Sequence, residues 1–369
     1  MKRRLLTLLF ALLTMQLGSL ISPAYACGCG AMIPEGYSRI GVEQETSVVR
    51  WDGRTEQIVM RFTVRGDAPR AAWIMPVPGR AAVELADGVM FGDLASLTRP
   101  EKKARPYFWP REGDWPFASR SRDTAGAPAP GAGAPVDVVG REQLGDFDVA
   151  RLTATDPDAL RTWLEANGFH LPDGLTAELE PYVDQKWEYV AVRLAPRQQG
   201  KTLRGILDPL RIRFDSDRPV YPMRLSRLAK TPQSLRLYVL ADHRMQPASP
   251  IGGADPKVSF AGTITPTGAL AALTGGEPAY LTAIEQEFPE PGRIDGDHLL
   301  RAAASDAPYR RAVYHDELLT VAGGVPVWLL TAAAATAAVA TALFTTLRIR
   351  RRRNAPRPPE LVGSAAVLD

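Results

Sequence analysis

The sequence predicts an α+β fold: a β-rich N-terminal part, then an α+β part with a mostly antiparallel sheet, and one C-terminal transmembrane helix. Short apolar runs separated by turn residues fill the first third of the chain. Strand and helix patterns alternate in the next part. An uncharged run of 23 residues follows near the C-terminus. The composition, 45% hydrophobic and 23% charged, is that of a globular domain, which excludes disorder throughout the chain and a protein with many membrane spans.

Residues 1–26 have the three parts of a secretory signal peptide. Lys2, Arg3 and Arg4 are followed by an apolar stretch over residues 5–21, and Ala24 and Ala26 form an Ala-x-Ala cleavage signal. We therefore expect cleavage after Ala26 and export of the remaining chain. Lipidation of Cys27, which would become the first mature residue, is the alternative.

Residues 27–120 form the expected β-rich N-terminal part. Residues 45–51 and 57–64 are predicted strands, and Asp52-Gly53 between them is a hairpin signal. A third strand is expected over residues 71–76 and a short helix over residues 91–97, which the Arg99-Pro100 pair ends.

Residues 121–135 are rich in Ala, Gly and Pro without apolar periodicity, which predicts a linker or a long loop. The α+β part then covers residues 136–324. Strands are expected at 148–152, 187–194, 210–214 and 234–241. Helices are expected from Thr155, its N-cap, to Gly168, and over residues 175–182. Residues 252–307 are expected to be loop-rich, with weak helices around 278–288 and 297–304.

The uncharged run over residues 325–347 predicts a transmembrane helix, because 23 helical residues extend about 35 Å and the hydrocarbon core is about 30 Å thick. A buried Ala-rich core helix is the alternative. Trp328 is expected to anchor the outer end at the interface. A basic cluster at the inner end predicts a cytoplasmic tail over residues 348–369, among anionic lipid head groups; it consists of Arg348, Arg350, Arg351, Arg352 and Arg353.

Small residues recur along one stripe of this helix at Ala334, Ala338 and Ala342. Such spacing lets two helices approach closely in a membrane, so a weak homo-oligomer is one expectation. Chance spacing in an Ala-rich span is the alternative.

The net charge of +3 is located at the two ends of the chain. The first 26 residues contribute +3 and the tail after Leu347 contributes +4, which leaves −4 for the segment between them. The basic balance therefore reflects membrane topology, and we expect no nucleic-acid partner.

Cys27 and Cys29 are the two cysteines of the chain. Residues two apart close only a small, strained disulfide ring, so a local disulfide or an inert pair is one interpretation. Lipidation or redox use of Cys27 and Cys29 is another. Two thiolates without a neighbouring histidine form an incomplete zinc site.

The sequence contains no recognised nucleophile, metalloprotease or phosphate-loop motif, so no catalytic residue, metal site or cofactor is predicted. Three histidines have an adjacent aspartate, namely His243, His298 and His315. Adjacent side chains diverge on strands and helices, so these pairs are expected to be chance surface neighbours.

Residues 99–117 interleave Lys and Arg with aromatic rings. Tyr107, Trp109 and Trp115 are candidate contacts for glycan rings, anionic wall polymer or lipid head groups. The alternative is a loop whose rings pack on the domain core.

Several spaced motifs resemble one bacterial family, the domain of unknown function 2330. They are residues 26–30 (Ala-Cys-Gly-Cys-Gly), 73–78 (Trp-Ile-Met-Pro-Val-Pro), 158–168, 221–225 (Tyr-Pro-Met-Arg-Leu) and 237–240 (Leu-Tyr-Val-Leu). The resemblance implies a signal peptide, an ectodomain and a frequent C-terminal anchor. It implies no activity and no catalytic residues.

The expected protein is a single-span, membrane-anchored, extracytoplasmic protein of the bacterial cell envelope, with its C-terminus in the cytoplasm. We expect a non-enzymatic binding module for an envelope protein or a wall polymer. An envelope hydrolase or transferase without a recognisable motif, and a redox or metal-handling protein using Cys27 and Cys29, are the alternatives.

Overall fold

The computed structural model describes residues 30–112, 114, 143–144, 147–152, 157–171, 174–196 and 200–354. The predicted signal peptide, Cys27, Cys29, Trp115 and the linker at 121–135 lie outside the described residues. The chain forms two compact units. The first contains residues up to Glu101 together with Val136–Arg311, and the second contains Lys102–Pro135 together with Ala312–Asp369.

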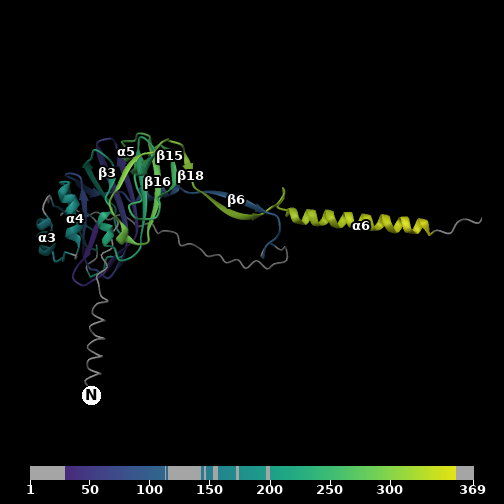
Figure 1. Ribbon diagram of the computed structural model, residues 1–369, viewed down its shortest axis with the longest axis horizontal. Helices are drawn as coiled ribbons and strands as arrows, with labels where there is room; N and C mark the ends of the chain where they lie inside the picture. The colour runs from purple at the N-terminus through teal and green to yellow at the C-terminus, as the bar shows by residue number, and fades with distance from the viewer. Residues whose placement is uncertain are drawn as a thin grey trace, which may run out of the picture. The chain divides into compact units, whose positions relative to one another are not determined.

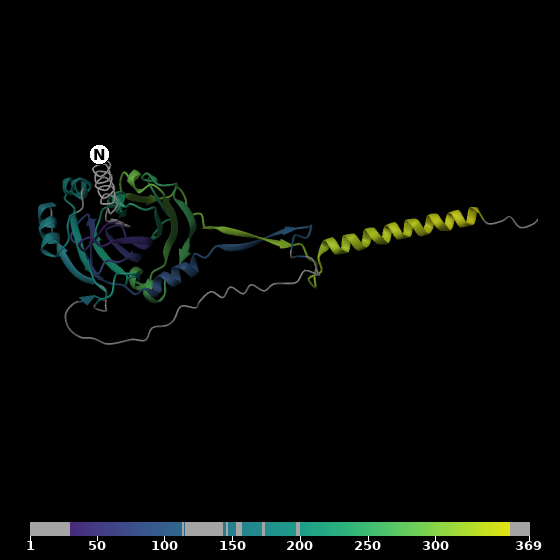
Figure 2. The same cartoon turned by 90° about the horizontal axis from the view of Figure 1, so that it is seen from below.

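The first unit is built on two large sheets (Figures 1 and 2). The smaller sheet has the strand order β1-β4-β9-β8-β7 and is antiparallel throughout. Its strands are β1 (Ala31–Pro34), β4 (Ala71–Val77), β7 (Gln143–Leu144), β8 (Phe147–Leu152) and β9 (Glu188–Leu194).

The larger sheet has nine strands in the order β18-β15-β16-β13-β2-β3-β11-β5, and β10 also pairs with β3. β2 and β13 run parallel, and the other pairs are antiparallel. The strands are β2 (Ile40–Trp51), β3 (Thr55–Gly66), β5 (Ala82–Leu85), β10 (Gly205–Ile206), β11 (Leu210–Asp215), β13 (Gln233–Ala241), β15 (Lys257–Ile264), β16 (Ala279–Phe288) and β18 (Tyr309–Arg310).

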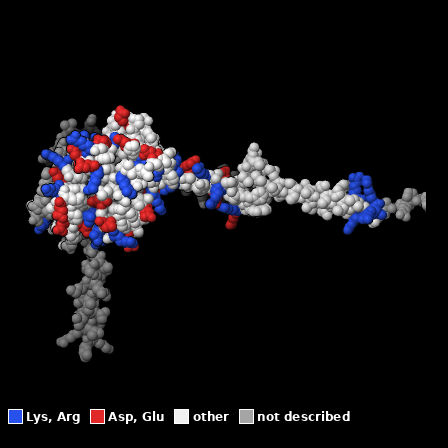
Figure 3. All heavy atoms as spheres, turned by 45° about the horizontal axis from the view of Figure 1, so that its top comes forward, with Lys and Arg blue, Asp and Glu red and all other residues white. Residues whose placement is uncertain are grey.

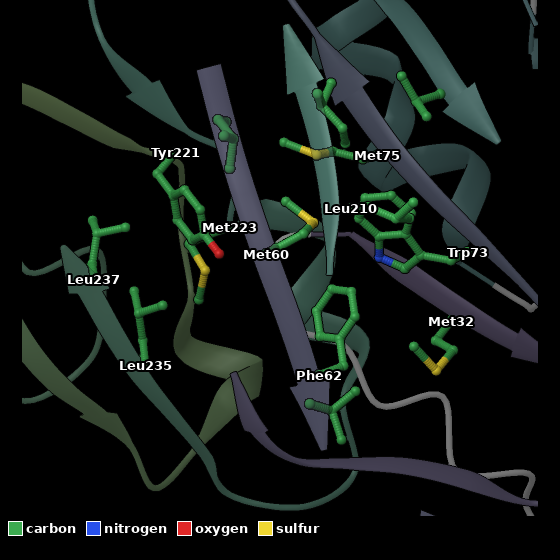
Figure 4. Packing of buried hydrophobic residues seen from close by; sticks show 14 of the residues in the cluster. Met32, Met60, Phe62, Trp73, Met75, Leu210, Tyr221, Met223, Leu235 and Leu237 are labelled. Atoms are coloured by element: carbon green, nitrogen blue, oxygen red, sulfur yellow. The ribbon is translucent and has the colours of Figure 1, made fainter. Parts of the chain in front are cut away.

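The main hydrophobic core lies between the two sheets. Phe62 of β3 contacts Trp73 of β4 with ring centroids 5.6 Å apart. Met60, Met75 and Leu210 lie close to this pair (Figure 4). Each large apolar side chain buried here contributes about 1.5–3 kcal/mol relative to its exposed state, which explains why the sheets pack face to face.

Helices cover the outer face of each sheet. Leu160 and Leu179 of α3 (Pro157–Ala166) and α4 (Leu175–Asp184) pack on the smaller sheet. Phe91 and Leu270 of α2 (Val89–Leu97) and α5 (Gly268–Thr274) pack on the larger one. The first unit therefore has four layers, helix, sheet, sheet and helix.

The predicted N-terminal hairpin is confirmed. β2 and β3 pair in an antiparallel register that places Trp51 opposite Glu56. The carboxylate of Asp52 accepts hydrogen bonds from the backbone N–H groups of Arg54 and Thr55. Gly53 has a φ of 96°, a conformation that glycine adopts readily, so the turn residues act as the sequence predicts.

The expectation of weak helices around residues 278–288 and 297–304 is wrong. Residues 279–288 form strand β16 between β13 and β15, and residues 298–302 form β17 (His298–Ala302). Ala, Leu, Glu and Gln favour helices locally, but pairing on both sides overrides this propensity. At the end of β16, Ile284, Gln286 and Phe288 are buried while the residues between them are more exposed, as in a strand with one face on the core.

A small three-stranded sheet joins β17 to β12 (Val220–Tyr221) and β14 (Met245–Pro247). Two short 3-10 helices lie in this region, η1 (Arg224–Leu228) and η2 (Pro291–Arg293). Strands that precede and follow residues 121–135 are partners in both large sheets, as in the pairs β4–β9 and β2–β13.

The second unit contains a two-stranded ribbon and a long helix. The ribbon pairs β6 (Glu101–Tyr107) with β19 (Ala312–Leu318). The N–H of Glu101 donates to the carbonyl of Arg311, and the N–H of Leu319 donates to the carbonyl of Tyr107, both at 2.9 Å. The two strands therefore run in the same direction.

Helix α6 (Val327–Arg353) has 27 residues and is the one helix among the described residues that is long and apolar enough to cross a membrane. It begins two residues later than the predicted segment at 325–347, because Pro326 precedes its first turn, and it continues through the arginine cluster. Figure 3 shows few charges along the helix and a basic cluster at its end.

Candidate functional site

A groove of about 580 Å³ lies at one end of the β2–β3 pair in the first unit. The start of β2, the end of β3 and the segment before β13 form its walls. Its lining residues are Arg39, Ile40, Gly41, Val42, Glu43, Arg65, Gly66, Asp67, Arg204, Thr231 and Pro232.

Two local features of the backbone shape this groove. Gly66 pairs with Ile40, and a Cβ atom at Gly66 would lie 2.1 Å from the carbonyl oxygen of Arg39. Only glycine therefore allows the strands to approach so closely. The β2–β3 register shifts between Val42 and Gln44, which leaves Glu43 unpaired at the groove. Such bulges redirect side chains at the end of a sheet.

Three arginines and two carboxylates surround the groove. Arg65 lies 2.5 Å from Glu43, and Arg39 lies 3.8 Å from Asp67. The guanidinium of Arg204 donates to the backbone carbonyl of Gly66 at 3.3 Å. These ion pairs are exposed and contribute only about 0–1 kcal/mol each, so an incoming anion can replace the carboxylates at little cost.

A buried polar cluster lies inside the first unit. The hydroxyl groups of Ser47 and Tyr221 are 2.6 Å apart, and Tyr221 also donates to the carboxylate of Glu45. A serine, a phenol and a carboxylate in contact resemble parts of a hydrolytic site. The exposed fractions of these three residues are 0%, 0% and 3%, so the cluster is closed to substrate and acts as part of the core.

His298 lies in β17 opposite Tyr221 of β12 and is 1% exposed. The expectation that it is a surface residue is wrong, because β17 is packed against Phe288, whose ring lies 6.4 Å away. Neither ring nitrogen has a hydrogen-bond partner within the described part of the chain. Burial lowers the pKa of His298 to about 4, so the imidazole is neutral at pH 7.

The expectation that adjacent histidine and aspartate side chains do not pair is confirmed for the three described pairs, since His315 lies 3.8 Å from Glu317 while Asp316 accepts hydrogen bonds from Arg105 and Arg111. His243 pairs with Asp306, at 2.8 Å, and this hydrogen bond raises the pKa of His243. Asp297 accepts hydrogen bonds from the Tyr182 hydroxyl and the N–H of Met223, both at 2.7 Å, so it anchors α4 to η1.

Two sequence-predicted contact residues lie at the tip of the ribbon in the second unit. Tyr107 is half-buried beneath Arg111, whose guanidinium lies 4.1 Å from its ring centroid. Trp109 is 72% exposed. Trp115, Cys27 and Cys29 lie outside the described residues. Trp328 lies in the first turn of α6, and the cationic residues are in its last turns, at Arg348, Arg350, Arg351, Arg352 and Arg353.

Among the residues that the structure describes, no three side chains of His, Cys, Asp or Glu come together in a group that could hold a metal ion.

Comparison with protein families shows the family to which the chain belongs. A family model described as an uncharacterized protein conserved in bacteria, DUF2330, matches residues 23–301, about three quarters of the 369 residues. The chain belongs to the DUF2330 family. No curated protein and no solved structure matches the chain.

The DUF2330 region contains the groove and the buried polar cluster, whereas β19 and α6 follow it. Sequence analysis did not identify the groove of this DUF2330 protein. Arg39, Arg65 and Arg204 are far apart in the sequence and form no motif, so only strand pairing brings them together. The nearest local signal was the Arg65-Gly66-Asp67 turn at the end of a predicted strand.

Proposed function

We propose that this DUF2330 protein is a single-span protein of the bacterial cell envelope that holds a binding domain outside the cytoplasmic membrane. After removal of residues 1–26, the domain is extracytoplasmic, α6 crosses the membrane and the arginine-rich tail is cytoplasmic. The length and apolar character of α6 support the anchor, and its terminal arginines support the orientation.

The domain binds an anionic group of an envelope protein or wall polymer in the groove, without catalysing a reaction. The observation that carries this proposal is the convergence of Arg39, Arg65 and Arg204 on one groove. Guanidinium groups bind carboxylates and phosphates in a two-pronged geometry. Ile40 and Val42, which also line the groove, are buried in the main core and hold the start of β2 in place.

A catalytic function has weaker support. The one serine–tyrosine–glutamate cluster among the described residues is buried, and the groove holds arginines and carboxylates without a nucleophile activated by a base.

Binding is tested with short polyphosphate and poly-L-glutamate as probes, by titration calorimetry on the full-length protein in detergent. The test variant carries Arg39→Gln, Arg65→Gln and Arg204→Gln. We expect it to lose at least about tenfold in affinity, which corresponds to about 1.4 kcal/mol. We also expect binding by the parent protein to weaken as salt rises.

A control variant with Arg80→Gln, Arg213→Gln and Arg218→Gln removes the same charge from exposed sites outside the groove. It should retain the parent affinity. Equal losses in both variants would show that only net charge matters, and no loss in either would place binding elsewhere.

A further inference from the structure

The tip of the ribbon is joined to the start of α6 by backbone hydrogen bonds. The N–H of Leu319 donates to the carbonyl of Tyr107, and the N–H of Val327 donates to the carbonyl of Leu319, both at 2.9 Å. Between these two bonds the chain makes a tight turn, with Gly323 and Gly324 in the left-handed region. The turn brings the first residue of α6 back beside the end of the ribbon.

These bonds limit the distance between the ribbon tip and the membrane span. Backbone segments joined by such hydrogen bonds lie about 4.8 Å apart. The two successive bonds, from Tyr107 to Leu319 and from Leu319 to Val327, therefore place Tyr107 within about 10 Å of Val327. The head-group region on each side of the hydrocarbon core is about 5–8 Å thick. A span that starts at Val327 therefore places the residues after Tyr107 at the head-group level.

The side chains at the tip have the chemistry that this level of the membrane favours. Phe108 and Trp109 contact each other edge to face, with ring centroids 5.1 Å apart, and Trp109 is largely exposed. Tryptophan concentrates at membrane interfaces because its ring is apolar and its N–H is polar. Trp328, in the first turn of α6, lies at the same end of the helix.

Two carboxylates near the tip, Asp114 and Asp316, are held by neighbouring side chains. Asp316 of β19 accepts hydrogen bonds from Arg105 at 2.7 Å and from Arg111 at 2.6 Å, which lower its pKa to about 2. The hydroxyl of Tyr107 donates to Asp114 at 2.6 Å. These two carboxylates are therefore compensated, while Glu112 beside the tip is exposed.

We propose that Phe108 and Trp109 form a second membrane contact, inserting into the outer head-group region beside α6 and fixing the ribbon at the bilayer surface. This inference rests on the proposed membrane span. It selects lipid, rather than glycan or wall polymer, as the partner of this aromatic tip.

The test measures the depth of a nitrobenzoxadiazole dye in the full-length protein, reconstituted in vesicles of phosphatidylcholine and phosphatidylglycerol. Cys27→Ser and Cys29→Ser remove the native thiols. A single label site is then introduced by Glu112→Cys next to the tip, by Lys102→Cys at the other end of β6, or by Ala338→Cys within α6. Quenching is recorded with nitroxide lipids labelled at the head group or in the middle of the acyl chain.

We expect the head-group nitroxide to quench the label at position 112 several-fold more than the label at position 102. Adding Phe108→Ala and Trp109→Ala should reduce quenching at position 112 toward the level at position 102. The conservative change Trp109→Tyr should retain it. As a matched control, Tyr37→Ala removes an aromatic ring that is 94% exposed in the first unit and should leave quenching at position 112 unchanged.

Equal quenching at positions 112 and 102 would overturn the inference, as would quenching at position 112 that survives loss of both rings. The label at position 338 separates this failure from failure of the membrane span. Strong mid-chain quenching there would uphold the span while the tip proposal falls. Absence of mid-chain quenching at position 338 would overturn both the membrane span and the proposed contact of the tip.

Discussion

Glu56 shows how a single carboxyl group can set the pH dependence of this fold. It lies fully buried in β3, where the N–H of Val220 donates to its carboxyl oxygens at 3.0 and 3.2 Å. Burial raises the pKa of Glu56 well above its ordinary value of 4.5, and the hydrogen bond from Val220 only partly offsets this effect. The folded state therefore retains a proton that the unfolded state releases.

The sign of the effect on stability follows from proton binding. Above pH 4.5 the unfolded chain binds fewer protons at Glu56 than the folded chain, so folding stability falls as pH rises toward the folded-state pKa. The slope is at most about 1.4 kcal/mol per pH unit. His298 acts in the opposite sense, because its lowered pKa removes stability as pH falls from 6.5 toward 4.

We predict that Glu56→Gln stabilises the protein at pH 8 by about 1–3 kcal/mol, because the neutral amide can accept the Val220 hydrogen bond without ionising. Near pH 4.5 the two proteins should be equally stable. Urea unfolding of parent and variant from pH 4.5 to 9 measures the difference, which cancels the contribution of His298. The exposed Glu277→Gln should show no such trend, and a constant difference across this range would contradict the prediction.

At the scale of elements, close strand approach depends on residues without a Cβ atom. Gly66 ends β3 against the carbonyl of Arg39, while Gly92 in α2 has open space around its Cα. Close packing therefore requires glycine at position 66, whereas neither sterics nor backbone conformation requires it at position 92.

We predict that Gly66→Ala destabilises the protein by about 1–3 kcal/mol, because the added methyl group overlaps the Arg39 carbonyl and must displace the start of β2. It should also weaken probe binding in the groove. Gly92→Ala is the control and should stabilise α2 by up to about 1 kcal/mol. Thermal unfolding and the polyphosphate titration measure both effects; an unchanged melting temperature for Gly66→Ala would show that β2 can shift freely.

The elements also show where local patterns succeed. The β2–β3 hairpin was predictable because Asp52-Gly53 determines the turn and apolar alternation determines the face. Strand β16 could not be predicted in this way, because several of its residues favour helices. Its strand conformation depends on β13 and β15, which lie on either side of it. The buried position of His298 likewise depends on pairing with β12, which is distant in sequence, and on packing against Phe288.

At the scale of the whole molecule, the proposed orientation depends on charge at the two ends of the chain. The arginines that end α6 should hold that end in the cytoplasm, since cationic flanks resist translocation. The first unit, which carries the groove, precedes α6 in the chain and is proposed to lie outside.

We predict that alkaline phosphatase fused after Asp369 is inactive and that the same enzyme fused at Gly323 is active, because this reporter folds only outside the cytoplasm. A cytoplasmic reporter at the same sites should give the reverse pattern. Replacing the five arginines from Arg348 to Arg353 with glutamine should produce mixed orientations. Phosphatase activity after Asp369 in the parent protein would contradict the proposed topology.

The sequence by itself determined the features that depend on local chemistry. The apolar length of α6, its arginine flank, the N-terminal hairpin and membership of the DUF2330 family follow from neighbouring residues whose spacing sets the structure. Tertiary structure alone decided how strands from distant segments combine into two facing sheets. It brought Arg39, Arg65 and Arg204 to one groove, and it buried Glu56 and His298. These features depend on pairing between residues up to about two hundred positions apart, and no local periodicity specifies which strands will meet.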